Sequence, residues 1–210
     1  MSKVPTFLAG RLLALAILTG AGGTAVYVAT DAATEAGLRD EYVQAVARDQ
    51  GVSQAVKIAM VMGSFYESSG KHIGTPYVDK NGRGQPLTVC NGITGREVVA
   101  GRYYTPADCY ALERGRYTQA EREAQALLPR WSTYSDLTRA TFIDFVWNKG
   151  SGALATSTMR VLANAGNLAA ACQQMPRWNK GTVAGVLKVL GGLQLRGDAN
   201  GELCIDGTKV

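Results

Sequence analysis

Residues 65–95 read FYESSGKHIGTPYVDKNGRGQPLTVCNGITG, a polar and turn-rich stretch that carries two acids, Glu67 and Asp79. The residues just before it, 52–62, are apolar at helical spacing, so Glu67 is expected at or just past the end of a buried helix. After Glu67 glycine and proline become frequent, while PLTVC is briefly β-like. This pattern predicts a small irregular β-hairpin region.

The two acids have different expected surroundings. A glutamate at the end of an apolar helix is partly desolvated, which disfavours its charged form and keeps a proton on it near neutral pH. An aspartate in a turn-rich hairpin stays solvated and ionised. One acid that protonates a leaving oxygen and one carboxylate that activates water or stabilises positive charge are the equipment of a glycosidase. The spacing alone is also compatible with both acids being ordinary residues of a surface loop.

The remainder of the chain is mostly helical in pattern. Thr105 followed by Pro106 is typical of a helix N-terminus, and Gly150 of a helix C-terminus. Helices are predicted over residues 105–128, 135–150, 156–166 and 167–178, before a closing segment at 192–204. The predicted fold class is α+β, mostly α, with one small sheet.

Composition limits the class of protein. The chain has 210 residues, 46% of them hydrophobic and 19% charged, which indicates one folded domain of ordinary size plus an appendage. A net charge of +5 and a pI near 9.1 favour an acidic partner such as nucleic acid, anionic lipid or an anionic wall polymer. Long basic runs are absent from the sequence, so a nucleic-acid partner is not expected.

The first thirty residues differ in kind from the rest. Lys3 and Arg11 precede a run from Leu12 to Thr30 that has no charged residue and is close to the roughly 20 residues that cross a bilayer. We expect a transmembrane segment with its amino terminus in the cytoplasm and the remainder exported. A cleaved signal peptide is the alternative. Glycine, threonine and alanine weaken the span, although GAGG is also typical of a helix-pairing face.

The predicted organisation is a membrane segment at 1–30, a polar helix or connector at 31–54 and a folded domain at 55–210. The cysteines, Cys90, Cys109, Cys172 and Cys204, all follow the span. An even number of cysteines beyond a membrane segment favours disulfides in an oxidising compartment, with three pairings possible. The chain lacks a Cys-x-x-Cys motif and has one histidine, so a metal site is not expected.

Several motifs in order carry a resemblance to a known family. PYVDKNGRGQPLTVCNGITG resembles the catalytic hairpin of phage-type lysozymes, glycoside hydrolase family 24. The likeness continues through YYTPADCYALE, FVWNKGSGALATSTM, AACQQMPRW and KVLGGLQLRGDANGELC, and covers about residues 55–205. The amino-terminal span resembles the signal-anchor-release segment of one endolysin group in this family. The resemblance implies a lysozyme-like domain, with the β-hairpin region followed by a helical lobe and preceded by the transmembrane segment.

The resemblance also implies roles for individual residues. Glu67 matches the proton-donating acid, Asp79 the second carboxylate, and Thr88 the threonine that helps to hold the attacking water. The gaps from Glu67 to Asp79 and from Asp79 to Thr88 are each longer than is common in the family. The extra residues look like SSG near the helix end and RGQ in the turn. Outside the resemblance, a turn-capping role for Asp79 and a plain strand role for Thr88 remain open.

Other side chains are expected near the saccharide. Trp147 and Asn148 match the aromatic and amide residues that the family presents to the sugar, and Tyr77 is a further candidate; packing or capping is the alternative for all three. Trp178 is expected in the core, and the sole histidine, His72, at the surface or in a hydrogen bond. The disulfide pairs that the resemblance implies are Cys90–Cys109 and Cys172–Cys204.

The resemblance therefore implies an exported muramidase that cleaves the β-1,4 bond between N-acetylmuramic acid and N-acetylglucosamine, with inversion and without a cofactor. The expected partners are peptidoglycan and, through the amino-terminal segment, the host inner membrane, from which a monomer is released to the periplasm. A lytic transglycosylase, a catalytically dead wall-binding module and an unrelated helical membrane adaptor are the alternatives.

Overall fold

The computed structural model describes residues 2–5, 8, 12, 35–68, 71–80, 84–183 and 185–209. Apart from Leu12, the predicted membrane span lies outside these residues. Within the described ranges, no helix combines the length and the apolar character that crossing a bilayer requires.

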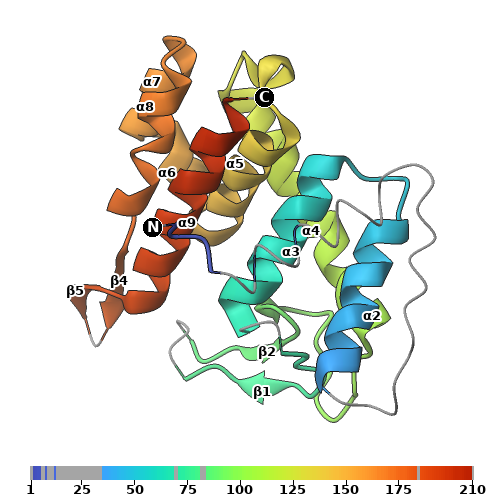
Figure 1. Ribbon diagram of the computed structural model, residues 1–210. Helices are drawn as coiled ribbons and strands as arrows, with labels where there is room; N and C mark the ends of the chain where they lie inside the picture. The colour runs from blue at the N-terminus through green and yellow to red at the C-terminus, as the bar shows by residue number, and fades with distance from the viewer. Residues whose placement is uncertain are drawn as a thin grey trace.

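Helices dominate the chain. Its first half contains α2 (Glu35–Arg48), α3 (Gln54–Ser68), β1 (Tyr77–Val78), β2 (Leu87–Val89), β3 (Ile93–Thr94), α4 (Pro106–Leu127) and α5 (Asp136–Lys149). Its second half contains α6 (Ser151–Ala155), α7 (Thr158–Asn164), α8 (Leu168–Cys172), β4 (Lys180–Val183), β5 (Val186–Val189) and α9 (Gly191–Gly207). Short 3-10 turns occupy Trp131–Thr133 and Met175–Arg177. Figure 1 shows α2 and the strands β1 and β2 at one end of the molecule, and α5 to α9 at the other.

Local sequence signals explain where the long helices begin and end. Thr105 accepts from the backbone of Asp108 and the Asp108 carboxylate accepts from the backbone of Thr105, a capping box that starts α4 as predicted. Ser135 caps the start of α5, and Gly150, with a φ of 83°, follows its last residue. The helix predicted over 167–178 is shorter than expected: α8 ends at Cys172, and a 3-10 turn follows that contains Pro176.

The small sheet predicted near Asp79 is present, but the expectation of one sheet was wrong. Strands β1, β2 and β3 form an antiparallel sheet in that order, with Tyr77 opposite Thr88. Strands β4 and β5 form a second antiparallel pair. Most of its residues are exposed, so no alternation of buried and polar positions marked it in the sequence, although its valines favour strand structure.

The core is continuous from α2 to α9. Helix α3 packs on α5, and α5 packs on α4 and α9. Fully buried side chains such as Met60, Tyr117 and Phe142 fill these contacts. Helix α2 packs against α4 and buries Tyr42, Val43, Val46 and Ala47. Within the range expected to form a polar helix or connector, residues 35–48 are therefore a helix with an apolar face.

Two disulfides join elements across this core, and both pairs are those that the resemblance implied. Cys90 is bonded to Cys109 and Cys172 to Cys204. Their sequence separations are 19 and 32 residues. By lowering the conformational entropy of the unfolded chain, each disulfide stabilises the folded state by roughly 3–4 kcal/mol. The first ties the hairpin region to α4, and the second ties α8 to α9.

The described part of the amino terminus lies beside α9, as Figure 1 shows. Ser2 and the backbone of Lys3 donate to the carboxylate of Glu202. The Lys3 ammonium lies 3.8 Å from Asp198. Leu8 is fully buried.

Candidate active site

Glu67 is the penultimate residue of α3, as the apolar periodicity predicted. Its side chain is 28% exposed, and its Oε1 lies 2.6 Å from Nη1 of Arg196 on α9. The helix end thus presents a carboxylate that is reachable from solvent and held by a cation from the far end of the chain.

Arg196 belongs to a buried polar cluster that joins α3, α5 and α9. Its Nε and Nη2 donate to the two oxygens of Asp144 at 2.9 and 2.8 Å. Asp144 is fully buried, and Asn200 donates a further hydrogen bond to it. Burial by itself lowers the pKa of Arg196, but the carboxylates of Asp144 and Glu67 outweigh burial and leave that pKa raised. A bidentate pair of this kind fixes the guanidinium in one orientation.

The surroundings of Glu67 include a cation that the sequence did not predict. Arg196 donates two hydrogen bonds to Asp144, which fix the position of its guanidinium. The contact between Arg196 and Oε1 of Glu67 therefore holds that carboxylate at the end of α3.

An open cleft of about 420 Å³ lies beside Glu67. Its lining residues come from α3, the β2–β3 turn, α4 and α5: Glu67, Asn91, Gly92, Arg116, Gln119, Ala120, Glu123, Val146, Trp147 and Asn148. Trp147 is stacked on Tyr117, with ring centroids 4.1 Å apart and planes 9° apart. Trp147 and Asn148, both expected near a saccharide, thus lie in the same cleft as Glu67.

The three hairpin candidates share one face of the small sheet. Tyr77 and Thr88 are directly opposite each other, and Asp79 follows two positions after Tyr77, so all three are on the same side. Burial raises the pKa of Tyr77, and the carboxylates of Asp79 and then Glu67 raise it further. Both carboxylates therefore lie within electrostatic reach of the same phenol.

The hairpin candidates are not part of the lining of the 420 Å³ cleft. The backbone N–H of Asp79 donates to the carbonyl of Pro86 at 3.0 Å. Thr88 is 2% exposed, and its hydroxyl donates to the same carbonyl at 3.1 Å. Ser69, Gly70 and Arg83, which belong to the two additions noted in the sequence, lie outside the described residues.

Two other sequence expectations concern packing. Nε2 of His72 donates to the carbonyl of Tyr104 at 2.9 Å, so the expectation of a surface or hydrogen-bonded histidine is confirmed. Burial lowers the pKa of this imidazole. Trp178 packs edge-on against Phe145 and is partly buried against the core, as expected.

Sequence reasoning missed Asp144, Arg196 and Glu113. A signal for Asp144 was available, since it is a single acid within the apolar run TFIDFVW, and a buried acid requires a partner. Nothing local indicated that Arg196 was that partner. Glu113 stands in a helix rich in charged residues, where a solvent-facing position was the natural expectation.

Comparisons with known proteins identify a family and similar endolysins. The phage lysozyme family matches residues 72–200. A SAR-endolysin of Bacteriophage PS119 is 34% identical over 134 residues, 64% of this chain and 75% of the relative. A SAR-endolysin of Enterobacteria phage PA-2 is 31% identical over 155 residues, 74% of this chain and 90% of the relative.

Solved structures share the fold. The active form of P1 phage endolysin Lyz superposes with a TM-score of 0.67 at 20% identity, covering 81% of this chain and 94% of that one. An endolysin from Escherichia coli O157:H7 phage FAHEc1 gives a TM-score of 0.62 at 20% identity, covering 76% and 95%.

The fold places the chain in the lysozyme-like structural class. The chain belongs to the phage lysozyme family. It is therefore a lysozyme, an enzyme that hydrolyses peptidoglycan.

Proposed function

We propose that Glu67 is the general acid of an endolysin that cleaves the β-1,4 bond between N-acetylmuramic acid and N-acetylglucosamine. Glu67 gives its proton to the glycosidic oxygen as the bond from that oxygen to the anomeric carbon breaks. Water adds to the anomeric carbon, and its proton passes to Asp79. The observation that carries this proposal is the exposed end of Glu67 in the cleft, with its other oxygen held by Arg196.

Asp79 and Thr88 complete the proposed mechanism. Asp79 serves as the ionised carboxylate that takes the proton of water, and Thr88 helps to hold that water. Their place on one face of the sheet, with the charges of Asp79 and Glu67 both acting on Tyr77, supports this assignment. Inversion at the anomeric carbon follows if water attacks from the side opposite the leaving oxygen.

The cleft wall supplies the proposed contacts to sugar. The ring of Trp147 is held flat against Tyr117, which gives a rigid apolar face, and Asn148 offers an amide beside it. A flat aromatic face with a neighbouring amide suits a pyranose ring, which has apolar faces and polar edges. Tyr77, 43% exposed on the sheet, is proposed as a further contact.

Turbidity loss of outer-membrane-stripped bacterial cells tests the function. Wild type should clear the suspension, and Glu67→Gln should not, because glutamine keeps the shape and removes the acid. The released fragments should end in reducing N-acetylmuramic acid. Anhydro-sugar ends would indicate a lytic transglycosylase instead, and absence of clearing by folded wild type would indicate a wall-binding module.

We also propose that the amino-terminal segment is a signal anchor, with its amino terminus in the cytoplasm, and that the enzyme leaves the inner membrane to act as a periplasmic monomer. The contacts of Ser2 and Lys3 with Glu202 on α9 support release. They require both ends of the segment on the same side of the membrane.

Cell fractionation before and after depolarisation tests this release. Wild type should move from the membrane to the soluble periplasmic fraction at full length. Replacing Gly20, Gly22 and Gly23 with leucine should hold the protein in the membrane, because the span then inserts more strongly. A soluble, shortened wild type before depolarisation would instead indicate a cleaved signal peptide.

A further inference from the structure

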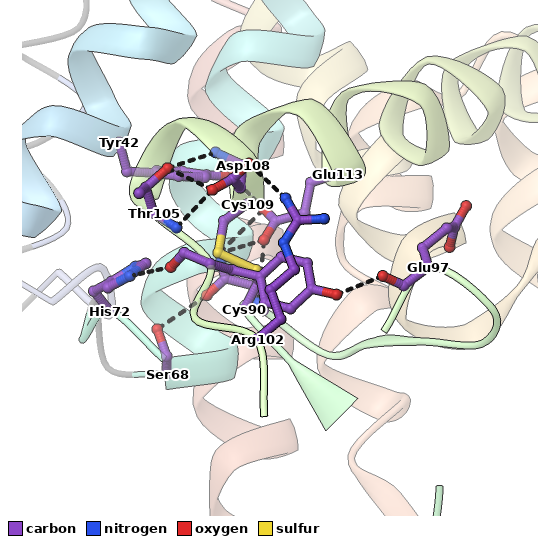
Figure 2. The surroundings of a disulfide bond; sticks show 12 residues. Tyr42, Ser68, His72, Cys90, Glu97, Arg102, Thr105, Asp108, Cys109 and Glu113 are labelled. Carbon is purple, nitrogen blue, oxygen red and sulfur yellow. Dashed lines mark hydrogen bonds and ion pairs between the residues drawn. A yellow bond between two sulfur atoms is a disulfide. The ribbon is translucent and has the colours of Figure 1, made fainter. Parts of the chain in front are cut away.

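A second buried carboxylate, Glu113 on α4, is bonded to Asn91, a residue that lines the cleft. It has no part in the mechanism above. Its side chain is fully buried. Glu113 Oε1 accepts from the backbone N–H of Asn91 at 3.1 Å and from Asn91 Nδ2 at 3.0 Å. Its Oε2 is 3.1 Å from the same Nδ2 and accepts from the hydroxyl of Tyr42 on α2. Figure 2 shows Glu113 and Tyr42 beside the Cys90–Cys109 disulfide.

Asn91 is held from several directions at once. The residue before it, Cys90, is joined to α4 by the disulfide. Asn91 Oδ1 accepts from the hydroxyl of Ser68, the residue that follows Glu67, at 3.0 Å. Asn91 is itself buried. Glu113 therefore binds a residue that is also bonded to the end of the helix carrying Glu67.

The residue after Asn91 lies beside the carboxylate of Glu67. Gly92 lines the cleft with Glu67, and its φ of 85° is one that glycine adopts without strain. A Cβ placed on Gly92 would lie 3.9 Å from Oε2 of Glu67, the oxygen that Arg196 does not hold. A shift of the turn at Asn91 would move this backbone relative to Oε2.

We propose that Glu113 is a positioning residue for hydrolysis: it fixes the Asn91–Gly92 turn against the end of α3, and so sets where the free oxygen of Glu67 lies relative to the saccharide. The inference rests on Glu67 acting as the general acid. The hydroxyl of Tyr42 on α2 donates to Glu113. The position of α2 can therefore affect Asn91 and the cleft through Glu113.

The chemistry of the position supports this role over a packing role. A fully buried acid is costly unless its polar atoms are bonded, and a leucine of similar size would fill the space at lower cost. Burial raises the pKa of Glu113 to about 7, with the bonds from Tyr42 and Asn91 opposing the rise. What a leucine cannot do is accept from the backbone and side chain of Asn91.

Three substitutions at one position separate geometry from acidity and from folding. Glu113→Gln keeps an acceptor for Asn91 and a donor toward Tyr42, and lacks a charge. Glu113→Leu keeps the volume and removes every acceptor. Glu113→Asp keeps both oxygens and withdraws them by about one methylene, which is a milder change if the leucine variant does not fold. Each is made in the full chain and compared with Glu67→Gln.

The readout is kcat and KM on a soluble, uncross-linked peptidoglycan oligosaccharide, per folded molecule and well below each melting midpoint. Glu113→Leu should lower kcat by roughly 10- to 100-fold, the range expected when a reacting group is displaced by up to about 1 Å, and KM should change much less. The kcat of Glu113→Asp should lie between those of Glu113→Leu and wild type. Glu113→Gln should recover kcat to within about threefold of wild type at pH 7.

Wild-type kcat in folded Glu113→Leu, or in folded Glu113→Asp when the leucine variant does not fold, would overturn the inference. So would a Glu113→Gln variant as slow as Glu113→Leu, since the charge and not the hydrogen bonds would then matter. If Glu67→Gln retains activity, the proposed mechanism fails instead, and the two failures are distinguishable in the same assay.

Discussion

Two buried carboxylates flank the candidate active site, and they are stabilised in different ways. Asp144 is bonded to the guanidinium of Arg196, whereas Glu113 is bonded to the neutral groups of Asn91 and Tyr42. The charge of Asp144 is paired with an opposite charge, which also holds Glu67. The neutral partners of Glu113 offset its burial only in part, and its pKa is raised to about 7. The second cluster therefore responds to protonation near neutral pH.

The largest expected effect comes from breaking the ion-paired cluster. Arg196→Met should destabilise the fold by roughly 3–5 kcal/mol, because Asp144 is left buried and uncompensated. The denaturant midpoint measures this loss. The double variant Arg196→Met with Asp144→Leu should regain much of it; if the single and double variants are equally unstable, the cost is not that of an unpaired charge.

The next effect concerns pH and the second cluster. Burial raises the pKa of Glu113 from 4.5 to about 7, a shift worth about 3 kcal/mol. A raised pKa means that the folded state binds more protons than the unfolded state between pH 4.5 and 7. The stability associated with Glu113 is therefore complete below pH 4.5 and is lost as pH rises to 7.

Comparison of wild type with Glu113→Gln isolates this contribution, because other groups titrate nearby. Glu67 and Tyr117 also act on Glu113 electrostatically, and Arg39, Lys71 and His72 line the crevice that contains Tyr42 and Asn91. Relative to wild type, the melting midpoint of Glu113→Gln should rise as the pH is raised from 4.5 to 8. A difference that is constant across this range would mean that Glu113 does not titrate there.

A smaller effect tests Tyr117, a residue on which both carboxylates act. Burial raises the pKa of Tyr117, and the charges of Asp144 and then Glu113 add to it, so its phenol is within electrostatic reach of both. Its hydroxyl lies 1.8 Å from where a Cβ on Gly63 would be. Gly63→Ala should therefore cost about 1–3 kcal/mol through overpacking, and calorimetric unfolding measures the loss.

Tyr117→Phe offers a matched partner for Gly63→Ala. Removing the hydroxyl relieves the closest contact and leaves the ring carbon 3.0 Å from the added methyl, so rescue should be partial. Complete additivity of the two changes would show that the hydroxyl is not what excludes a side chain at Gly63.

The smallest expected effect concerns the hydrogen bond from Tyr42 to Glu113 in the second cluster. Tyr42→Phe removes one hydrogen bond to Glu113 and should cost about 1 kcal/mol in the free energy of unfolding. Lys209→Ala is the control, since Lys209 and Asp206 form an exposed pair worth less than about 1 kcal/mol. Equal effects of the two would mean that the Tyr42 contact contributes no more than a surface pair.

Local patterns in the sequence identified the parts of the site that depend on neighbouring residues. The apolar stripe before Glu67 located the end of α3, and Thr105 with Pro106 located the start of α4. The hairpin was expected from glycine, proline and PLTVC. The β4–β5 pair was missed because its exposure removed the alternation that identifies a strand.

The sequence by itself determined the helical lobe, the hairpin and, through its motifs, the family and both disulfide pairs. The tertiary structure alone decided that Arg196 holds Glu67 while bonded to Asp144, and that Glu113 is bonded to Asn91. Helix and turn signals act over a few residues, because they depend on backbone dihedrals and capping bonds. Buried polar partners are chosen by packing between helices distant in the chain, where each desolvated group must find its partner in space.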